Sequence, residues 1–239
     1  MVNELIELNK RELYNLEQLK NIKDNPVVIA TIFSVIKSVP IIGDLIDSSI
    51  EYTLTEFQQK KRDQLLEIIL SSDIHITSEA VNDVEFIVNF AKTLGVVNKL
   101  ATNDKVKYFA NLLKNTYFMN NSINADTYDE YLNILEDISF REIQYLCYLY
   151  NYSKDKNIKR WGSFKESFSK NFSIDKKLIY PIYYRLKRTG FVDEVLGFSP
   201  GTISGDEEAG YEMESGDIDT DYFYITKAFE KFREVVIEI

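Results

Sequence analysis

Apolar side chains recur at helical spacing through most of the first 138 residues, and this periodicity constrains the fold more than any other feature. The clearest case is the segment 103–119, in which Val106, Phe109 and Leu113 share one helix face. The segments with a similar pattern are 3–23, 41–70, 79–94 and 128–137. Helices with one apolar face must pack against one another, so residues 1–138 are predicted to form an all-α helical bundle.

Local sequence also predicts where several helices begin and end. A Ser/Thr-x-x-Glu sequence indicates a helix N-terminus, because the two side chains bond to each other's backbone N–H groups. Three such sequences that we expect to start helices begin at Thr127, Ser139 and Ser163. Gly95 is expected to end the helix over 79–94. We expect the apolar stripe of that helix to face the core, with Val81, Val84, Ile87, Val88 and Ala91 as its members.

The segment 27–46 is the most apolar stretch of the chain. Its length suits a membrane span, but Lys37, Pro40, Gly43 and Asp44 interrupt it. We favour a buried helix, a turn near Pro40 and a further helix that starts near Ile41. The alternatives are conditional contact with a membrane and a permanent span.

The last hundred residues have a different order of elements. Helices are predicted from Ser139 to Tyr150, from Ser163 to about Lys170, and over 174–189. A strand from Phe191, a polar loop, a strand over 221–225 and a helix capped by Thr226 follow. This order is typical of the winged-helix variant of the helix-turn-helix, in which the third helix reads the ligand and the hairpin is the wing. Residues 139–239 are therefore predicted to form a winged-helix-like domain.

Charge divides this domain into two parts of opposite sign. The whole chain has a net charge of −10. Basic residues nevertheless outnumber acidic ones over 154–188, whereas the predicted wing loop, 202–221, holds acidic residues and no Lys or Arg. A phosphate backbone would repel such a loop, which argues against a DNA-reading wing.

The third helix of this domain provides the candidate binding residues. Leu178, Ile179, Ile182 and Leu186 are expected to face inward. The residues expected on the opposite face are Lys176, Lys177, Tyr180, Tyr184, Lys187 and Arg188. A basic and aromatic face could contact phosphates, bind a protein or be plain solvated surface. Pro181 lies inside this helix and favours a kink or a later start.

The sequence contains few residues suited to catalysis or metal binding. His75 is the only histidine and Cys147 the only cysteine, which removes most zinc sites, Ser-His-Asp triads and Cys-His pairs. Asp217, Asp219 and Asp221 resemble the start of a calcium loop, but the expected glycine and terminal glutamate are missing. We therefore predict no catalytic residue, no metal site and no cofactor.

Two stretches resemble the abortive-infection alpha proteins of bacteria. They are KVKYFANLLKNTY over 105–117 and YDEYLNILEDISFREIQYLCYL over 128–149, and the resemblance extends over roughly residues 40–150. The resemblance implies a role in phage defence. It implies no catalytic residues.

These observations predict a non-enzymatic interaction protein of a bacterium or a mobile element. It would act through protein contacts of its winged-helix-like domain, made by the basic third helix and the acidic wing. The alternative is a DNA-binding transcriptional regulator of winged-helix type, which would be a homodimer. Homo-oligomers and conditional membrane contact through 27–46 are further expected associations. Residues 1–10 have no apolar run of the kind found in secretory signals, so a cytoplasmic location is expected.

Overall fold

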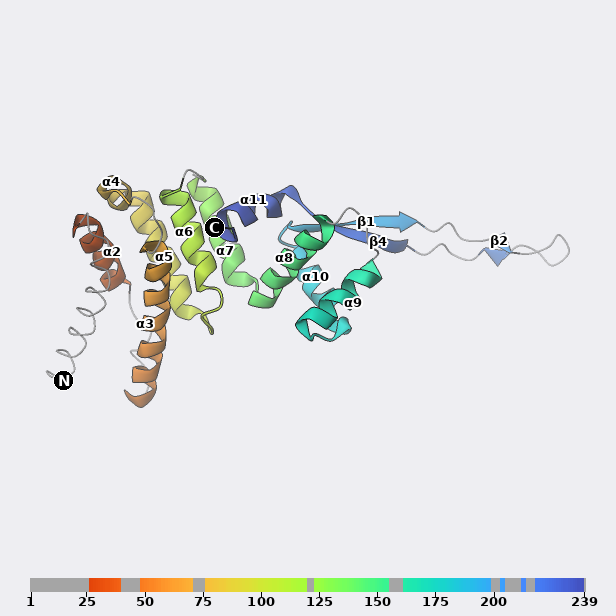
Figure 1. Cartoon of the computed structure of the whole chain (residues 1–239), viewed down its shortest axis with the longest axis horizontal. Helices are drawn as coiled ribbons and strands as arrows, with labels where there is room; N and C mark the ends of the chain where they lie inside the picture. Colours follow the sequence, from red (N-terminus) through yellow and green to blue (C-terminus); the bar gives the residue numbers. More distant parts are fainter. Residues whose placement is uncertain are drawn as a thin grey trace. The chain divides into compact units, whose positions relative to one another are not determined.

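The computed structural model shows a mainly helical protein with two small two-stranded antiparallel sheets (Figure 1). It describes residues 26–39, 48–70, 76–119, 123–154, 161–198, 203–204, 212–213 and 218–238. Two compact units divide the chain: an N-terminal unit, residues 1–136 with 235–239, and a C-terminal unit, residues 137–234. The predicted helix over 3–23, His75 and most of the loop 202–221 lie outside the described residues.

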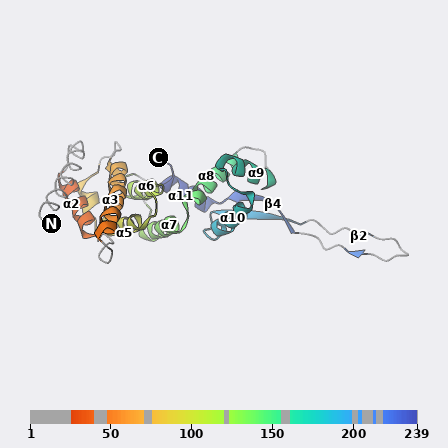
Figure 2. The same ribbon diagram turned by 90° about the horizontal axis from the view of Figure 1, so that it is seen from below.

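The N-terminal unit is a bundle of helices. They are α2 (Pro26–Ser38), α3 (Ser48–Leu70), α4 (Ser78–Asn82), α5 (Val84–Lys99), α6 (Val106–Tyr117) and α7 (Ala125–Asp137, whose last residue belongs to the other unit). Helix α3 packs on α5 and α6, and α2 packs on α4 and α5 (Figures 1 and 2). Leu65, Phe86, Leu94, Phe109 and Leu113 are almost fully buried at these contacts. The predicted inward face of the segment 103–119 is therefore confirmed.

The predicted helix over 79–94 is in fact two helices. Asp83 ends α4 and caps α5, where its side chain accepts a hydrogen bond from the backbone N–H of Glu85 at 3.1 Å. Gly95 does not end α5, which continues to Lys99. The helix continues because Val96 and Val97 are buried beyond the glycine, and their burial outweighs the roughly 1 kcal/mol that glycine costs inside a helix.

The predicted stripe of this helix is also wrong. Val84 is 73% exposed and Val88 is 45% exposed, although Val81 is buried as expected. The buried stripe of α5 consists of Phe86, Asn89, Phe90, Thr93, Leu94, Val96, Val97 and Asn98. The larger Phe and Leu side chains bury more apolar area than the valines would, and this decides which face of the helix turns inward.

Of the three predicted helix starts, only the one at Ser139 is confirmed. Its backbone N–H donates to Glu142 Oε2 at 2.7 Å, and the N–H of Glu142 donates to Ser139 Oγ at 3.3 Å. Thr127 lies inside α7, because Asn124 caps that helix by accepting from the N–H of Thr127 at 2.8 Å. Ser163 lies inside its helix as well, which already begins at Trp161. In both cases the helix starts upstream of the predicted cap residue, which therefore lies inside the helix.

The described part of the segment 27–46 is α2. Pro26 starts this helix. Proline suits a first helical position because a backbone N–H there would have no intrahelical partner, so its absence costs no hydrogen bond. Ile32, Val35 and Ile36 are buried. The helix ends at Ser38, two residues before Pro40, as the break at this proline predicts. No helix within the described ranges is long and apolar enough to cross a membrane.

Two buried cations on α3 hold the C-terminal ends of two other helices. Lys61 donates to the carbonyl oxygens of Asn98 at 2.9 Å and Leu100 at 2.7 Å, at the end of α5. Arg62 donates to the carbonyl oxygens of Ile36 at 3.4 Å and Val39 at 3.1 Å, at the end of α2. Helix C-termini leave carbonyl groups without intrahelical partners and carry partial negative charge, so they favour these cations. Burial lowers the pKa of both side chains.

The end of the chain belongs to the N-terminal unit. Asn111 Nδ2 donates to the carbonyl oxygen of Val236 at 3.0 Å, and Asn115 Nδ2 donates to that of Val235 at 2.6 Å. Both asparagines lie on α6 and are buried. The last turn of the final helix, α11 (Lys227–Val236), is therefore capped by side chains of the bundle.

The C-terminal unit contains helices and a β-hairpin. Its elements are α8 (Phe140–Lys154), α9 (Trp161–Phe172), the 3₁₀ turn η2 (Lys176–Leu178), α10 (Ile179–Lys187), β1 (Val192–Phe198), β2 (Ile203–Ser204), β3 (Glu212–Met213), β4 (Ile218–Ile225) and most of α11. Strands β1 and β4 pair antiparallel from Val192↔Ile225 to Phe198↔Ile218, with an irregularity after Val195. The aromatic core includes Tyr145, Phe164, Phe168, Tyr183 and Phe229.

The two strands and the final helix occur where the sequence predicts them. Thr226 caps α11, since its Oγ1 accepts from the N–H of Phe229 at 3.4 Å. Thr226 also donates from Oγ1 to the carbonyl oxygen of Gly190 at 2.6 Å, which ties the end of β4 to the start of β1. The assignment of this unit to the winged-helix class stays a prediction.

Candidate interaction surface

The third helix of the C-terminal unit, α10, begins later than its sequence pattern predicts. Asp175 caps the preceding 3₁₀ turn by accepting from the N–H of Lys177 at 2.9 Å, and α10 starts at Ile179. Pro181 therefore lies in the first turn of α10, where a backbone N–H would have no intrahelical partner. This position explains why the helix tolerates the proline.

The inward face of α10 is predicted correctly except at its start. Ile179, Ile182 and Leu186 are buried, as expected, and Tyr183 is fully buried beside them. Leu178 is 48% exposed and does not belong to this face. The reason is that Leu178 lies in the 3₁₀ turn, whose tighter winding changes the direction of its side chain relative to the α-helix that follows.

The predicted outward face lies on the surface, and we call it the α10 face. Its members are Lys176, Lys177, Tyr180, Tyr184, Lys187 and Arg188; all are exposed except Lys187, which is half-buried. The rings of Tyr180 and Tyr184 stack, with centroids 6.3 Å apart and an angle of 23° between their planes. Tyr184 is 58% exposed and Tyr180 is 39% exposed. The centre of this face is thus a pair of aromatic rings open to solvent.

Cations surround the two rings. Lys177 lies one turn before Tyr180, and Arg188 lies one turn after Tyr184. Lys165 on α9 holds its Nζ 4.7 Å from the centroid of the Tyr180 ring. The sequence gives no sign of this last contact, because α9 and α10 are separate elements. The face therefore presents aromatic area edged by positive charge.

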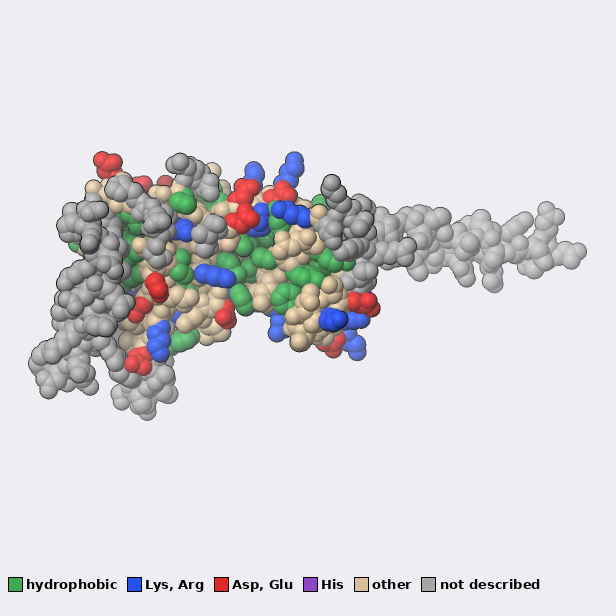
Figure 3. Space-filling view, in the orientation of Figure 1, with side chains coloured by type: hydrophobic (Ala, Val, Ile, Leu, Met, Phe, Trp, Pro, Cys, Tyr) green, Lys and Arg blue, Asp and Glu red, His purple; other side chains and the backbone are tan. Residues whose placement is uncertain are grey.

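Acidic partners balance part of this charge. Lys176 Nζ lies 3.1 Å from Glu166 Oε1, in an ion pair that is exposed on both sides. Arg185 Nη2 donates to Glu142 Oε2 at 2.9 Å. Figure 3 shows blue and red side chains lying side by side in the area of α9. An exposed pair such as Lys176–Glu166 contributes about 0–1 kcal/mol, so a ligand could displace it at little cost.

The hairpin that follows α10 has the opposite charge. Its acidic residues are Asp193 and Glu194 in β1, Glu212 in β3, and Asp219 and Asp221 in β4. These four strands contain no Lys or Arg. The hydroxyl of Tyr224 donates to Asp193 Oδ2 at 3.2 Å at the base of the hairpin. One unit therefore holds a basic helix face and an acidic strand pair.

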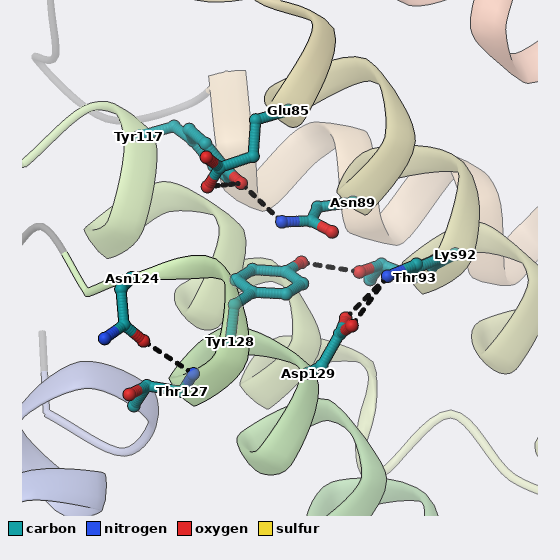
Figure 4. Close-up of polar contacts among 9 residues, drawn as sticks. All are labelled: Glu85, Asn89, Lys92, Thr93, Tyr117, Asn124, Thr127, Tyr128 and Asp129. Atoms are coloured by element: carbon teal, nitrogen blue, oxygen red, sulfur yellow. Dashed lines mark hydrogen bonds and ion pairs between the residues drawn. The ribbon is translucent and has the colours of Figure 1, made fainter.

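A second polar cluster joins α5, α6 and α7 (Figure 4). The hydroxyls of Tyr128 and Thr93 lie 2.6 Å apart, and both residues are fully buried. Asn89 Nδ2 donates to the hydroxyl of Tyr117 at 2.6 Å, and that hydroxyl donates to Glu85 Oε1 at 3.1 Å. Burial raises the pKa of Tyr117 and of Tyr128 well above the ordinary value. Tyr128 has no exposed surface for a substrate, so this cluster is a packing feature of the bundle.

Within the described ranges, no group of three His, Cys, Asp or Glu residues is arranged to hold a metal ion. His75 and Asp217 lie outside those ranges, and Cys147 is half-buried on α8. The α10 face is the candidate binding surface that the sequence predicts.

Comparison with known protein families, with curated proteins and with solved structures finds no match to this chain.

Proposed function

We propose that the chain is a non-enzymatic interaction protein that binds a protein partner through the α10 face. The observation that carries this function is the stacked, exposed pair Tyr180–Tyr184 with Lys177 and Arg188 at its two ends. Tyr and Arg are enriched among the residues that contribute most to protein interfaces, because they combine large contact area with a polar group. Leu178, in the 3₁₀ turn before α10, is also exposed.

The order of elements in the C-terminal unit supports a winged-helix-like reading of residues 139–239. Three helices are followed by a strand pair and a final helix, and α10 takes the place of the reading helix. In this reading the exposed side of the third helix is the place where a ligand binds. An acidic partner with apolar side chains would fit the aromatic centre and basic edges of the α10 face.

Phage defence in a bacterium or a mobile element is the proposed setting, and it rests on the resemblance of residues 40–150 to the abortive-infection alpha proteins. Expression in a phage-sensitive bacterium tests it by the efficiency with which phages form plaques. Protection that is lost in Lys177→Glu/Arg188→Glu would link the setting to the α10 face. Equal plaque numbers with and without the protein would contradict this setting.

Quantitative affinity capture from cells of the source organism tests the binding function. The full chain should enrich a protein that Lys177→Glu/Arg188→Glu fails to enrich. The matched control is Lys227→Glu/Lys231→Glu, which makes the same charge change at exposed positions of α11. A set of bound proteins that is the same for all three chains would contradict the proposal.

DNA binding is the second candidate function, because the cations of the α10 face lie on the third helix of the unit. The acidic strands beside them oppose it. Fluorescence anisotropy of labelled duplex DNA, at low and high salt, tests this candidate. The full chain is compared with a quadruple alanine variant of Lys176, Lys177, Lys187 and Arg188. Salt-sensitive binding that disappears in the variant would favour DNA. Absence of binding at low salt would exclude it.

A further inference from the structure

We infer that the α10 face binds the acidic hairpin of a second copy of this chain. Two copies would form a twofold dimer in which the hairpin of each copy lies on the α10 face of the other. The acidic hairpin is the strand set β1–β4 with its acidic residues Asp193, Glu194, Glu212, Asp219 and Asp221. This inference rests on the proposed function and names its partner. A twofold arrangement makes the contact twice, once in each direction.

Charge complementarity is the first argument. The α10 face carries lysines and an arginine, and its neighbour Lys165 adds a further cation. The described strands of the hairpin carry acidic residues and no basic ones. In a protein with a net charge of −10, most surfaces of a second copy would be repelled by an acidic hairpin, and the α10 face would attract it.

The strand pair and the helical segment have similar lengths. From Val192 to Phe198 the strand pair extends about 20 Å, at ~3.3 Å per residue. From Lys176 to Arg188 the helical segment also extends about 20 Å, at 1.5–2 Å per residue. Val192 at the base of the strand pair is buried in its own unit, so the outer part of the hairpin, which holds Asp219, is the part that can lie along α10 of a second copy.

The hairpin cannot easily reach the α10 face of its own chain. Strand β1 follows α10 after the turn at Gly190. The base of the strand pair packs on α8, α9 and α10, and its outer end extends beyond these helices (Figures 1 and 2). Asp219 pairs with Gly197, next to the outermost pair Phe198↔Ile218. The pairing would have to break for this end to fold back, whereas a second copy needs no such change.

The apolar chemistry of the two surfaces agrees as well. Strand β4 contains the aromatic run 222–224, and Tyr224 is 39% exposed. The α10 face offers the stacked rings of Tyr180 and Tyr184. Aromatic pairs contribute about 0.5–1.5 kcal/mol beyond their buried area, so contact between these rings would add specificity to the charge attraction.

Sedimentation velocity of the full chain tests this inference over a range of concentrations at low and high salt. The wild type should form a dimer whose dissociation constant rises with salt. Lys177→Glu/Arg188→Glu and Asp219→Lys/Asp221→Lys should each weaken the dimer by about tenfold or more, through repulsion at both contacts. The control Lys227→Glu/Lys231→Glu should leave the dissociation constant within about twofold of the wild type.

Mixing the two charge-reversed variants distinguishes loss of the interface from damage to the fold. An equimolar mixture of the two weakened variants should form a heterodimer, because the acidic α10 face of one copy then meets the basic hairpin of the other. A single chain with all four substitutions should dimerise again by itself. A wild-type chain that stays monomeric at low salt, or variants that do not recover on mixing, would overturn the inference. The proposed function would survive that result if affinity capture still identified a different protein dependent on Lys177 and Arg188.

Discussion

Arg185 on α10 and Glu142 on α8 are joined by a hydrogen bond of 2.9 Å between Nη2 and Oε2. The two ends of this pair have different environments, since the Glu142 side chain is 2% exposed and that of Arg185 is 60% exposed. The same oxygen accepts from the N–H and the hydroxyl of Ser139, at 2.7 and 2.8 Å. The capping box of α8 therefore also holds the helix that carries the candidate surface.

Arg185→Ala should lower the free energy of unfolding by about 2 kcal/mol, because it leaves a buried carboxylate with one donor group fewer. Arg188→Ala is the matched control at an exposed position of the same segment, and it should change the free energy by less than about 0.5 kcal/mol. Urea denaturation followed by circular dichroism measures both. Equal stability of the two variants would show that the Glu142 contact does not hold α10.

Arg62→Met should destabilise the N-terminal unit by about 2–3 kcal/mol. The substitution removes donors from the carbonyl oxygens of Ile36 and Val39 and from Asn98 Oδ1. Lys60→Met, at an exposed position of the same helix, is the control and should have little effect. Hydrogen exchange should show faster exchange of α2 in the Arg62 variant. Unchanged protection of α2 would disprove the role of Arg62 in holding that helix.

Tyr128→Phe tests the polar cluster of Figure 4 in alkali. Burial raises the pKa of Tyr128 in the folded protein, so its contribution to stability is present at neutral pH. That contribution is lost as the pH rises above about 10, where tyrosine ionises in the unfolded chain. The variant should be about 1–2 kcal/mol less stable than the wild type at neutral pH. Above pH 10, its free energy of unfolding should fall less steeply than that of the wild type, by up to about 1.4 kcal/mol per pH unit.

Thr93→Val is the control for this experiment. It removes the partner of the Tyr128 hydroxyl but keeps the buried tyrosine, so it should lower stability at neutral pH and retain the steep alkaline loss. Chemical denaturation at a series of pH values measures both variants. An alkaline slope of Tyr128→Phe equal to that of the wild type would contradict the effect of burial on this group.

Two glycines should respond to alanine with opposite signs. Gly95 lies inside α5 and Gly190 has a φ of 74°, and an added Cβ would meet nothing within 4 Å at either position. Only backbone preference then decides the result. Gly95→Ala should stabilise the protein by about 0.5–1 kcal/mol and Gly190→Ala should destabilise it by about 1–2 kcal/mol. Thermal unfolding measures both, and shifts of the same sign would contradict the assigned conformations.

The sequence predicts helices well where one strong apolar stripe exists, as in α6, and where a capping box has no competing cap upstream, as at Ser139. It fails at Gly95 and Val84, because burial of neighbouring side chains decides the helix length and its inward face. It also fails at Leu178, where a 3₁₀ turn replaces the first turn of the predicted helix. These outcomes depend on packing between elements, which local patterns do not contain.

For the candidate surface too, local sequence predicts the exposed residues but not their partners from other helices. The helical wheel of 174–189 places Tyr180, Tyr184, Lys177 and Arg188 on one side, and the structure exposes all four. The partners from other elements, Glu166, Lys165 and Glu142, were not predicted. They come from α8 and α9, and only the packing of these helices brings them to α10.

Photo-crosslinking from position 184 is the sharpest test of protein binding at the α10 face. The full chain with Tyr184→p-benzoylphenylalanine is irradiated in cells of the source organism, beside a chain with the same substitution at exposed Val84 of the other unit. We expect a crosslinked protein that is specific to position 184 and disappears in Lys177→Glu/Arg188→Glu. A second copy of the chain in that product would support the exchanged hairpin, and another protein would support the binding function alone. Crosslinks to nucleic acid only, or none specific to position 184, would contradict the assignment of the α10 face as a protein-binding surface.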